Sequence, residues 1–225
     1  MYIQFIAVNP ESIAAIKKVL FENYSDTIGT MPKNNFFIKE GPLTEKDLYA
    51  THAVVTPGNS FGHMTGGFDM ALVELLGFGL DDHVRDEIVN NEFGELNVGQ
   101  AMMISPADYK RDFEFNNGGP CPYIVYAPTM RVPGRISPGS SIPYMAMLAA
   151  MKVIATHNAV HHKSKESIID TVLIALPGAA TGEVPSETSI RQCLLAIEQV
   201  TNQTKYVNLN KDASEHNATI LNTWT

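Results

Sequence analysis

The sequence has little cysteine, few basic residues and no long apolar run, and each shortage excludes a class of protein. Its 225 residues include two cysteines, Cys121 and Cys193, which fit a reducing compartment and cannot form a zinc site alone, although they could still pair as one disulfide. Only 16 residues are Lys or Arg against 24 acidic residues. The net charge of -8 therefore argues against a nucleic-acid binder and against a protein that binds anionic membrane surfaces. A bound anion would have to be held locally, by backbone N–H groups or a few arginines.

Several further absences concern the organisation of the chain. No apolar run approaches the roughly 18 residues of a membrane-spanning helix. Residues 1–8 hold no basic segment and reach Asn9-Pro10 too early for a signal peptide, so we expect an intracellular protein, cytoplasmic or nuclear. No repeat or low-complexity linker divides the chain, and 44% of its residues are hydrophobic, so we expect residues 1–225 to form a single domain. No feature of the sequence indicates an oligomeric state.

Strands alternate with helices along almost the whole sequence, which is typical of an α/β fold with helices on both faces of a largely parallel sheet. Apolar runs between turn residues predict strands at 2–8, 35–40, 53–56, 98–104, 123–127, 171–176 and 206–209. Apolar residues at helical spacing predict helices at 10–23 and 186–200. Further helices are expected at 69–76, which glycines end, at 81–91, which is polar, and at 141–157, which is mostly apolar. A polar insertion at 105–122 could cover a site or lie elsewhere, and a long loop is expected at 128–140.

Two loops rich in small residues, 56–69 and 177–185, follow predicted strands and lead into predicted helices. Glycines allow a close approach of the backbone to a ligand, and consecutive N–H groups at a helix N-terminus form an anion site. Because ligands of open α/β sheets bind beyond the carboxyl ends of the strands, the spacing predicts a phosphate-bearing ligand held between the two loops. Ordinary turn formation is the alternative. Neither loop has the P-loop pattern or the dinucleotide-binding pattern.

Three blocks of sequence occur in an order and spacing that resemble a known family. Residues 54–60 read V-V-T-P-G-N-S and residues 66–69 read G-G-F-D, similar to a ligand loop V-N-A-A-N-S followed by G-G-G-V-D. Residues 123–128 resemble a strand Y-V-I-H-x-V-G-P, and residues 175–182, A-L-P-G-A-A-T-G, resemble a second loop I-A-F-P-A-I-S-T-G. Over about residues 35–210 the chain thus resembles the macrodomains, which bind ADP-ribose. The resemblance implies a three-layer α-β-α sandwich around a mixed, mostly parallel sheet of six or seven strands.

The resemblance also implies site residues. The interval of ten residues between Asn59 and Asp69 matches the hydrolytic branch of the family, in which this pair lies beside the distal ribose. Asp69 would act as a general base that activates water, and Asn59 would orient the ribose. The alternatives are that Asp69 caps the following helix and that Asn59 is a turn residue. The expected substrate-binding residues are Gly58, Ser60, Gly66, Gly67, Phe68, Thr181, Gly182, Glu183, Val184 and Arg131.

Charged residues near the loops have two interpretations each. Arg131 and Arg135 lie in the long loop, where an arginine could bind a terminal phosphate or simply be solvated. Glu183 could point to solvent or serve as an auxiliary acid–base group, and His63 could reach the substrate or be an exposed loop residue. No cluster of carboxylates and histidines indicates a metal, so no metal or other cofactor is expected.

Four positions depart from the family pattern. The Asp that holds the adenine amino group in family members is Pro42 here, and Glu40 or Asp47 are the candidates to replace it. Thr56 replaces the first Asn of the first loop, and Thr65 replaces the first of its three glycines. Val184 replaces an aromatic residue after the second loop.

The function that the resemblance implies is hydrolysis at the distal ribose of an ADP-ribose derivative. The substrate would be ADP-ribose 1''-phosphate, an O-acetyl ester or ADP-ribose linked to a protein. The Asn-Ser-Phe-Gly and Gly-Gly-Phe-Asp details are most similar to fungal macrodomains of the ADP-ribose-1''-phosphate phosphatase type. Two alternatives stay open, namely a non-enzymatic module that binds ADP-ribose, free or on a protein, and a degenerate macrodomain with another nucleotide ligand.

Overall fold

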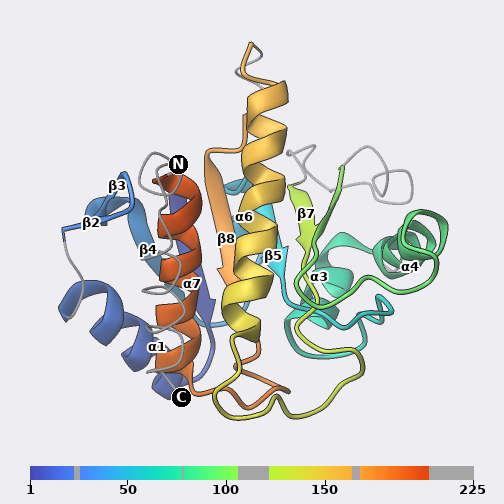
Figure 1. Cartoon of the computed structure of the whole chain (residues 1–225), viewed down its shortest axis with the longest axis horizontal. Helices are drawn as coiled ribbons and strands as arrows, with labels where there is room; N and C mark the ends of the chain where they lie inside the picture. Colours follow the sequence, from blue (N-terminus) through green and yellow to red (C-terminus); the bar gives the residue numbers. More distant parts are fainter. Residues whose placement is uncertain (23–25, 78, 106–121, 164–167, 203–225) are drawn as a thin grey trace, which may run out of the picture.

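Six strands of the chain form one sheet in the order β4-β1-β8-β5-β7-β6 (Figure 1). The computed structural model describes residues 1–22, 26–77, 79–105, 122–163 and 168–202. The strands are β1 (Tyr2–Ala7), β4 (Phe36–Glu40), β5 (Ala53–Thr56), β6 (Met102–Ile104), β7 (Tyr123–Tyr126) and β8 (Thr171–Ala175). Neighbouring strands are parallel except at one edge, where β6 pairs antiparallel with β7.

The register of the sheet brings the carboxyl ends of its central strands to one edge. Ile6 of β1 pairs with Ala175 of β8, and Thr56 of β5 pairs with Tyr126 of β7. The residues of these strands are almost fully buried, as the continuous apolar runs predict for strands covered on both faces. Loops that leave these strand ends are therefore neighbours in space, although the ends of β5 and β8 lie more than a hundred residues apart in sequence.

Helices cover both faces of the sheet. One face packs against α1 (Pro10–Lys17), α6 (Ile142–Val160) and α7 (Ser186–Thr201) through one apolar cluster that includes Ile16, Met147 and Leu194. The other face packs against α2 (Glu45–Tyr49), α3 (Gly67–Leu76) and α4 (Gly79–Asn91) through a second cluster. The α/β fold, the mixed and mostly parallel sheet, and the three-layer arrangement are confirmed.

Several element boundaries differ from the expectation. The strand predicted at 98–104 begins only at Met102, because Gly99 has a positive φ of 92° and the N–H of Gln100 turns back to the carbonyl of Asn97. The helix predicted at 10–23 ends at Lys17 and continues as a π-helical segment, η1 (Lys18–Glu22). The strand predicted at 206–209 and most of the 105–122 insertion lie outside the described residues.

Short elements were not predicted at all. Helix α2 has five residues and depends on a capping box between Thr44 and Asp47 rather than on an apolar stripe. The hairpin of β2 (Thr27–Ile28) and β3 (Met31–Pro32) and the 3-10 turn η2 (Lys33–Asn35) are too short for a periodic signal.

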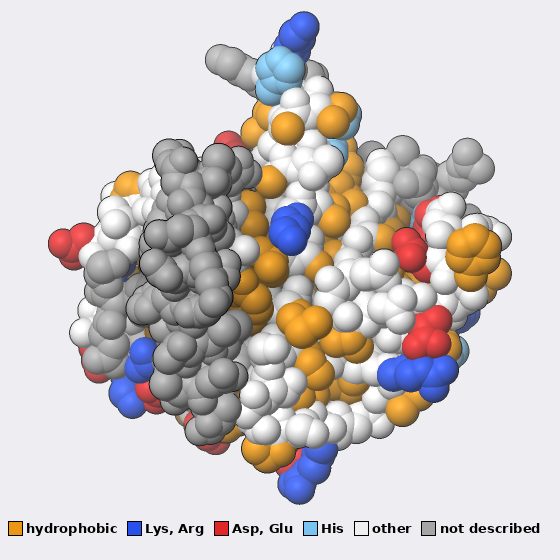
Figure 2. Space-filling view, in the orientation of Figure 1, with side chains coloured by type: hydrophobic (Ala, Val, Ile, Leu, Met, Phe, Trp, Pro, Cys, Tyr) orange, Lys and Arg blue, Asp and Glu red, His pale blue; other side chains and the backbone are white. Residues whose placement is uncertain are grey.

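Within the described ranges, each helix is too short or too polar to cross a membrane. On the face drawn in Figure 2, the Lys and Arg side chains are dispersed, and hydrophobic side chains gather beside α6. Met145 and Val160 of this helix are 40% and 69% exposed. The second cysteine, Cys193, is a buried free thiol in α7, whereas Cys121 lies outside the described residues.

Candidate functional site

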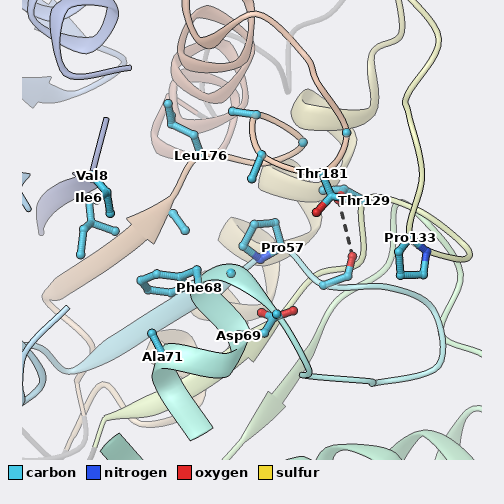
Figure 3. Close-up of a pocket in the computed structure, with 18 of the residues that line it drawn as sticks. Ile6, Val8, Pro57, Phe68, Asp69, Ala71, Thr129, Pro133, Leu176 and Thr181 are labelled. Atoms are coloured by element: carbon cyan, nitrogen blue, oxygen red, sulfur yellow. Dashed lines mark hydrogen bonds between the residues drawn. The ribbon is translucent and has the colours of Figure 1, made fainter. Parts of the chain in front are cut away.

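A cleft of about 610 Å³ opens at the carboxyl edge of the sheet (Figure 3). This volume lies within the range of roughly 300 to 1,000 Å³ that small-molecule sites occupy. Both loops singled out in the sequence line it, through residues 57–59, 63 and 65–69 of the first loop and 178–182 of the second. Since β5 and β8 are adjacent in the sheet, the two loops are adjacent above it. The expected convergence of the two loops on one cleft is thus observed.

The first loop is fixed to the end of β7 by Tyr126. A Cβ atom on Gly58 would lie 1.9 Å from the Tyr126 hydroxyl oxygen, so only glycine fits there. The Tyr126 hydroxyl donates to the carbonyl of Asn59 and accepts from its N–H, both at 3.0 Å. Burial raises the pKa of Tyr126, and the negative charge of Asp69 raises it further, so the phenol stays protonated.

The side chain of Asn59 lines the cleft but is largely used within its own loop. Its Oδ1 accepts from the N–H groups of Phe61 at 3.1 Å and His63 at 3.4 Å, and its Nδ2 donates to the carbonyl of His63 at 2.8 Å. This arrangement matches the alternative that Asn59 shapes a turn. One Nδ2 proton is left over for a ligand.

Asp69 is a buried carboxylate in the first turn of α3, at the wall of the cleft. It is 9% exposed, and its Oδ1 accepts a hydrogen bond from the hydroxyl of Thr56 at the end of β5. Burial raises the pKa of Asp69 from 3.8 to about 6; the Thr56 hydrogen bond opposes this shift, and the charge of Asp81 adds to it. Asp69 forms no helix-cap hydrogen bond, because the N-cap position of α3 is Gly66.

Backbone N–H groups supply the donors of the cleft. Helix α3 begins at Gly67, whose φ is 57°, and its N-cap residue has no side chain to cover the helix end. In the second loop, the N–H groups of Ala180, Thr181 and Gly182 have no acceptor in the part of the chain that the structure describes. All these residues line the cleft, whereas no Lys or Arg of the described ranges does. An anion would therefore be held by N–H groups and the positive end of α3.

Four expected substrate-binding residues do not line the cleft. Arg131 forms a bidentate pair with Glu95, with N···O distances of 2.7 and 3.0 Å, and it lies over the Phe61 ring at 5.1 Å. Glu183 pairs with Arg135 beside a separate shallow hollow, and this guanidinium lowers the pKa of Glu183. The other two are Ser60 and Val184, which are buried behind the loops.

The remaining expected residues line the cleft together. They are Asn59, Asp69, Gly58, Gly66, Gly67, Phe68, Thr181 and Gly182. His63 lines it too.

The residues at the adenine position of the family pattern are apolar. Pro42 and Leu43 line the cleft, but neither candidate replacement for the missing Asp does. Glu40 pairs with Lys17 at 2.5 Å. Asp47 accepts from the N–H of Thr44 at 2.9 Å and lies 3.2 Å from the Lys39 ammonium.

Sequence reasoning missed one whole wall of the cleft. The junction of β1 and α1 contributes Ile6, Val8, Asn9 and Ser12, and the long loop contributes Pro133. The signal was present, because the N-cap Asn9 and Pro10 mark a strand-to-helix junction at the same sheet edge. Within the described residues, no three His, Cys, Asp or Glu side chains are grouped as metal ligands.

Comparison with known proteins agrees with this architecture. A family model described as "Macro-like domain" matches residues 10–213. The macrodomain of Oceanobacillus iheyensis with MES bound has a TM-score of 0.50 and 17% identity, over 70% of this chain and 74% of that one. The same macrodomain with ADP has a TM-score of 0.50 and 16% identity, over 70% of this chain and 74% of that one. The macrodomain of Mycobacterium tuberculosis DarG has a TM-score of 0.51 and 16% identity, over 72% of this chain and 91% of that one. A search of curated protein sequences gave no match.

Proposed function

The chain belongs to the Macro-like domain family, and we propose that it hydrolyses an ADP-ribose derivative at the distal ribose. The observation that carries this proposal is the carboxylate of Asp69, the one carboxylate among the described residues that line the cleft, beside two loops that present backbone N–H groups. Burial raises the pKa of Asp69 to about 6, which makes its carboxylate a stronger base than an exposed Asp. Perturbed carboxylates in clefts are common features of catalytic sites.

The binding part of the proposal rests on the two loops. The diphosphate would lie between the N-terminus of α3 and the N–H groups of residues 180–182, where the donors are unpaired within the described residues. A related fold, the Oceanobacillus iheyensis macrodomain, was solved with ADP, which contains the same diphosphate. Recognition by N–H groups fits this cleft better than salt bridges do, because none of the described residues that line it is Lys or Arg.

The chemical step assigns a role to each residue beside the distal ribose. With the 1''-phosphate, Asp69 in its carboxylate form accepts a proton from water, and the water oxygen forms a bond to phosphorus. The bond between phosphorus and the ribose oxygen breaks, the ribose oxygen takes the proton from Asp69, and the products are ADP-ribose and inorganic phosphate. A carboxylate whose pKa is about 6 is mostly ionised at pH 7 and is a stronger base than an exposed Asp. Asn59 positions the ribose with its remaining amide proton.

Within this class, we propose ADP-ribose 1''-phosphate as the first substrate to test, because the sequence around Asn59 and Asp69 is most similar to that subtype. Release of inorganic phosphate should be detected with the wild-type protein, with EDTA present. Asp69→Asn should reduce kcat at least a hundredfold and leave the Kd for ADP-ribose within about threefold. Equal turnover by the two proteins would remove Asp69 from the mechanism.

A binding-only function is the second candidate, and one observation favours it. The amide of Asn59 is mostly occupied within its own turn, which limits its action on a ribose. A thermal-shift panel of ADP-ribose, its 1''-phosphate and other nucleotides separates the two, because any ligand of the folded state raises the melting temperature. Stabilisation by ADP-ribose without product from any of the three substrate types would identify a binding module.

A further inference from the structure

The cleft is polar at one end and apolar at the other (Figure 3). Asp69, Thr129 and Thr181 lie at one end, above β5 and β7. Ile6 and Val8, at the end of β1, lie towards the other end, and Phe68 of α3 lies on the same side of Asp69. Pro42 and Leu43, which follow β4, also line the cleft. A nucleotide with its diphosphate on the two loops and its distal sugar at Asp69 therefore has its base at the apolar end. There, the partly buried ring of Phe68 offers a surface for stacking.

The side-chain acceptors near the apolar end are engaged by other parts of the protein. The Oδ1 atom of Asn9 accepts from the N–H of Ser12 at 2.7 Å, and the hydroxyl of Ser12 is 2.7 Å from that of Ser186. Glu40 and Asp47 are held by Lys17 and Lys39 and do not line the cleft. In the described part of the chain, no carboxylate lines this end.

Side-chain acceptors that face carbon 6 of the base allow a protein to distinguish adenine from hypoxanthine. Adenine carries an amino group at carbon 6, whereas hypoxanthine carries a carbonyl oxygen, and the two bases have nearly the same shape and stacking surface. A site that pairs an acceptor with the amino group rejects the carbonyl by about tenfold or more, because two acceptors then face each other. An apolar slot binds either base by stacking and area burial alone.

We propose that this cleft selects its ligand at the diphosphate and the distal sugar and tolerates the base, so its substrate class is nucleoside-diphosphate ribose derivatives rather than those of adenosine alone. This inference rests on the proposed function, since it takes the distal sugar to lie at Asp69. Pro42 and Leu43 are the residues that set this tolerance.

Isothermal titration of the full chain with ADP-ribose and with its inosine analogue tests the inference. We expect the two Kd values to agree within fivefold, and a larger preference for either base overturns it. If ADP-ribose itself does not bind, the proposed function is wrong, and the inference falls with it. Binding of ADP-ribose with a strong preference for adenine overturns the inference and leaves the proposed function intact.

A pair of substitutions at Pro42 tests the position of the base. Pro42 is exposed and outside the helices and strands, so its replacement should leave the melting temperature nearly unchanged. Pro42→Asp adds an acceptor at the apolar end and should shift the ratio of the two Kd values at least tenfold towards ADP-ribose. Pro42→Ala is the matched control and should keep the wild-type ratio. An unchanged ratio in the folded Pro42→Asp variant would place the base elsewhere and overturn the inference.

Discussion

The hydroxyl of Thr56 donates a hydrogen bond to the carboxylate of Asp69, and both side chains are buried. The bond joins the last residue of β5 to the first turn of α3, so the strand that ends below the cleft holds the group proposed to act within it. It also opposes the effect of burial on the pKa of Asp69. Thr56 thereby influences both where the carboxylate lies and when it is ionised.

Removing the Thr56 hydroxyl should change the pH dependence of the reaction. In Thr56→Val the pKa of Asp69 should rise above about 6, because the hydrogen bond that favours the carboxylate is lost. The acid limb of the kcat/KM profile should move to higher pH. Thr56→Ser retains the hydroxyl and should restore the wild-type profile. A Thr56→Val profile that coincides with the wild type would mean that this bond does not control the ionisation.

Asp69 should reduce the stability of the free protein at neutral and alkaline pH. Its pKa of about 6 in the folded state exceeds the ordinary 3.8, so its favourable contribution is fully present below pH 3.8 and is lost as the pH rises through 6. The full shift corresponds to about 3 kcal/mol, of which about half is lost between pH 5 and pH 8. Asp69→Asn should therefore be more stable than wild type, with a larger difference at pH 8. Urea unfolding at both pH values checks this, and a constant difference would contradict it.

Gly58 and Gly66 should respond differently to the same substitution. Gly58→Ala should destabilise the fold by about 1 to 3 kcal/mol or more, because its Cβ would overlap the Tyr126 ring and hydroxyl. Gly66 has an extended backbone with a φ of -162°, and its Cβ would meet no atom within 4 Å. Gly66→Ala should cost less than about 1 kcal/mol, mainly through the poorer N-cap. Equal losses in denaturant unfolding would show that the contact with Tyr126 is not limiting.

Asn59 should support its own loop as well as position the ribose. Asn59→Ala removes the acceptor for two loop N–H groups and the donor to the His63 carbonyl, so we expect a loss of about 1 to 3 kcal/mol in unfolding free energy. Ligand affinity should fall with the loop. A folded variant with unchanged stability and a greatly reduced kcat would instead assign Asn59 to the chemistry.

Arg131 should be dispensable for ligand binding. Its guanidinium is committed to Glu95 and Phe61, away from the cleft. Arg131→Ala should therefore leave the Kd for ADP-ribose and for its 1''-phosphate within twofold by calorimetry. A selective loss of affinity for the 1''-phosphate would show that the arginine leaves Glu95 and reaches the terminal phosphate.

Local patterns of apolar residues predicted much of the fold. Buried strands such as Thr171–Ala175 are continuous apolar runs, and α7 has a clear apolar stripe. Five-residue α2 and the hairpin at Thr27–Pro32 could not be found this way, because each is formed by caps and turns over too few residues for a period.

The α/β layers and the two small-residue loops could be predicted from the sequence alone, because apolar periodicity and glycine act over a few neighbouring residues. Which polar groups stay available to a ligand depends on the folded arrangement. Arg131, Glu183 and the carboxylates near Pro42 pair with partners brought together by the fold, and Asp69 becomes a stronger base because its surroundings bury it. Hydrogen-bond partners and burial depend on contacts between segments that are distant in sequence. No periodic pattern in the local sequence predicts those contacts.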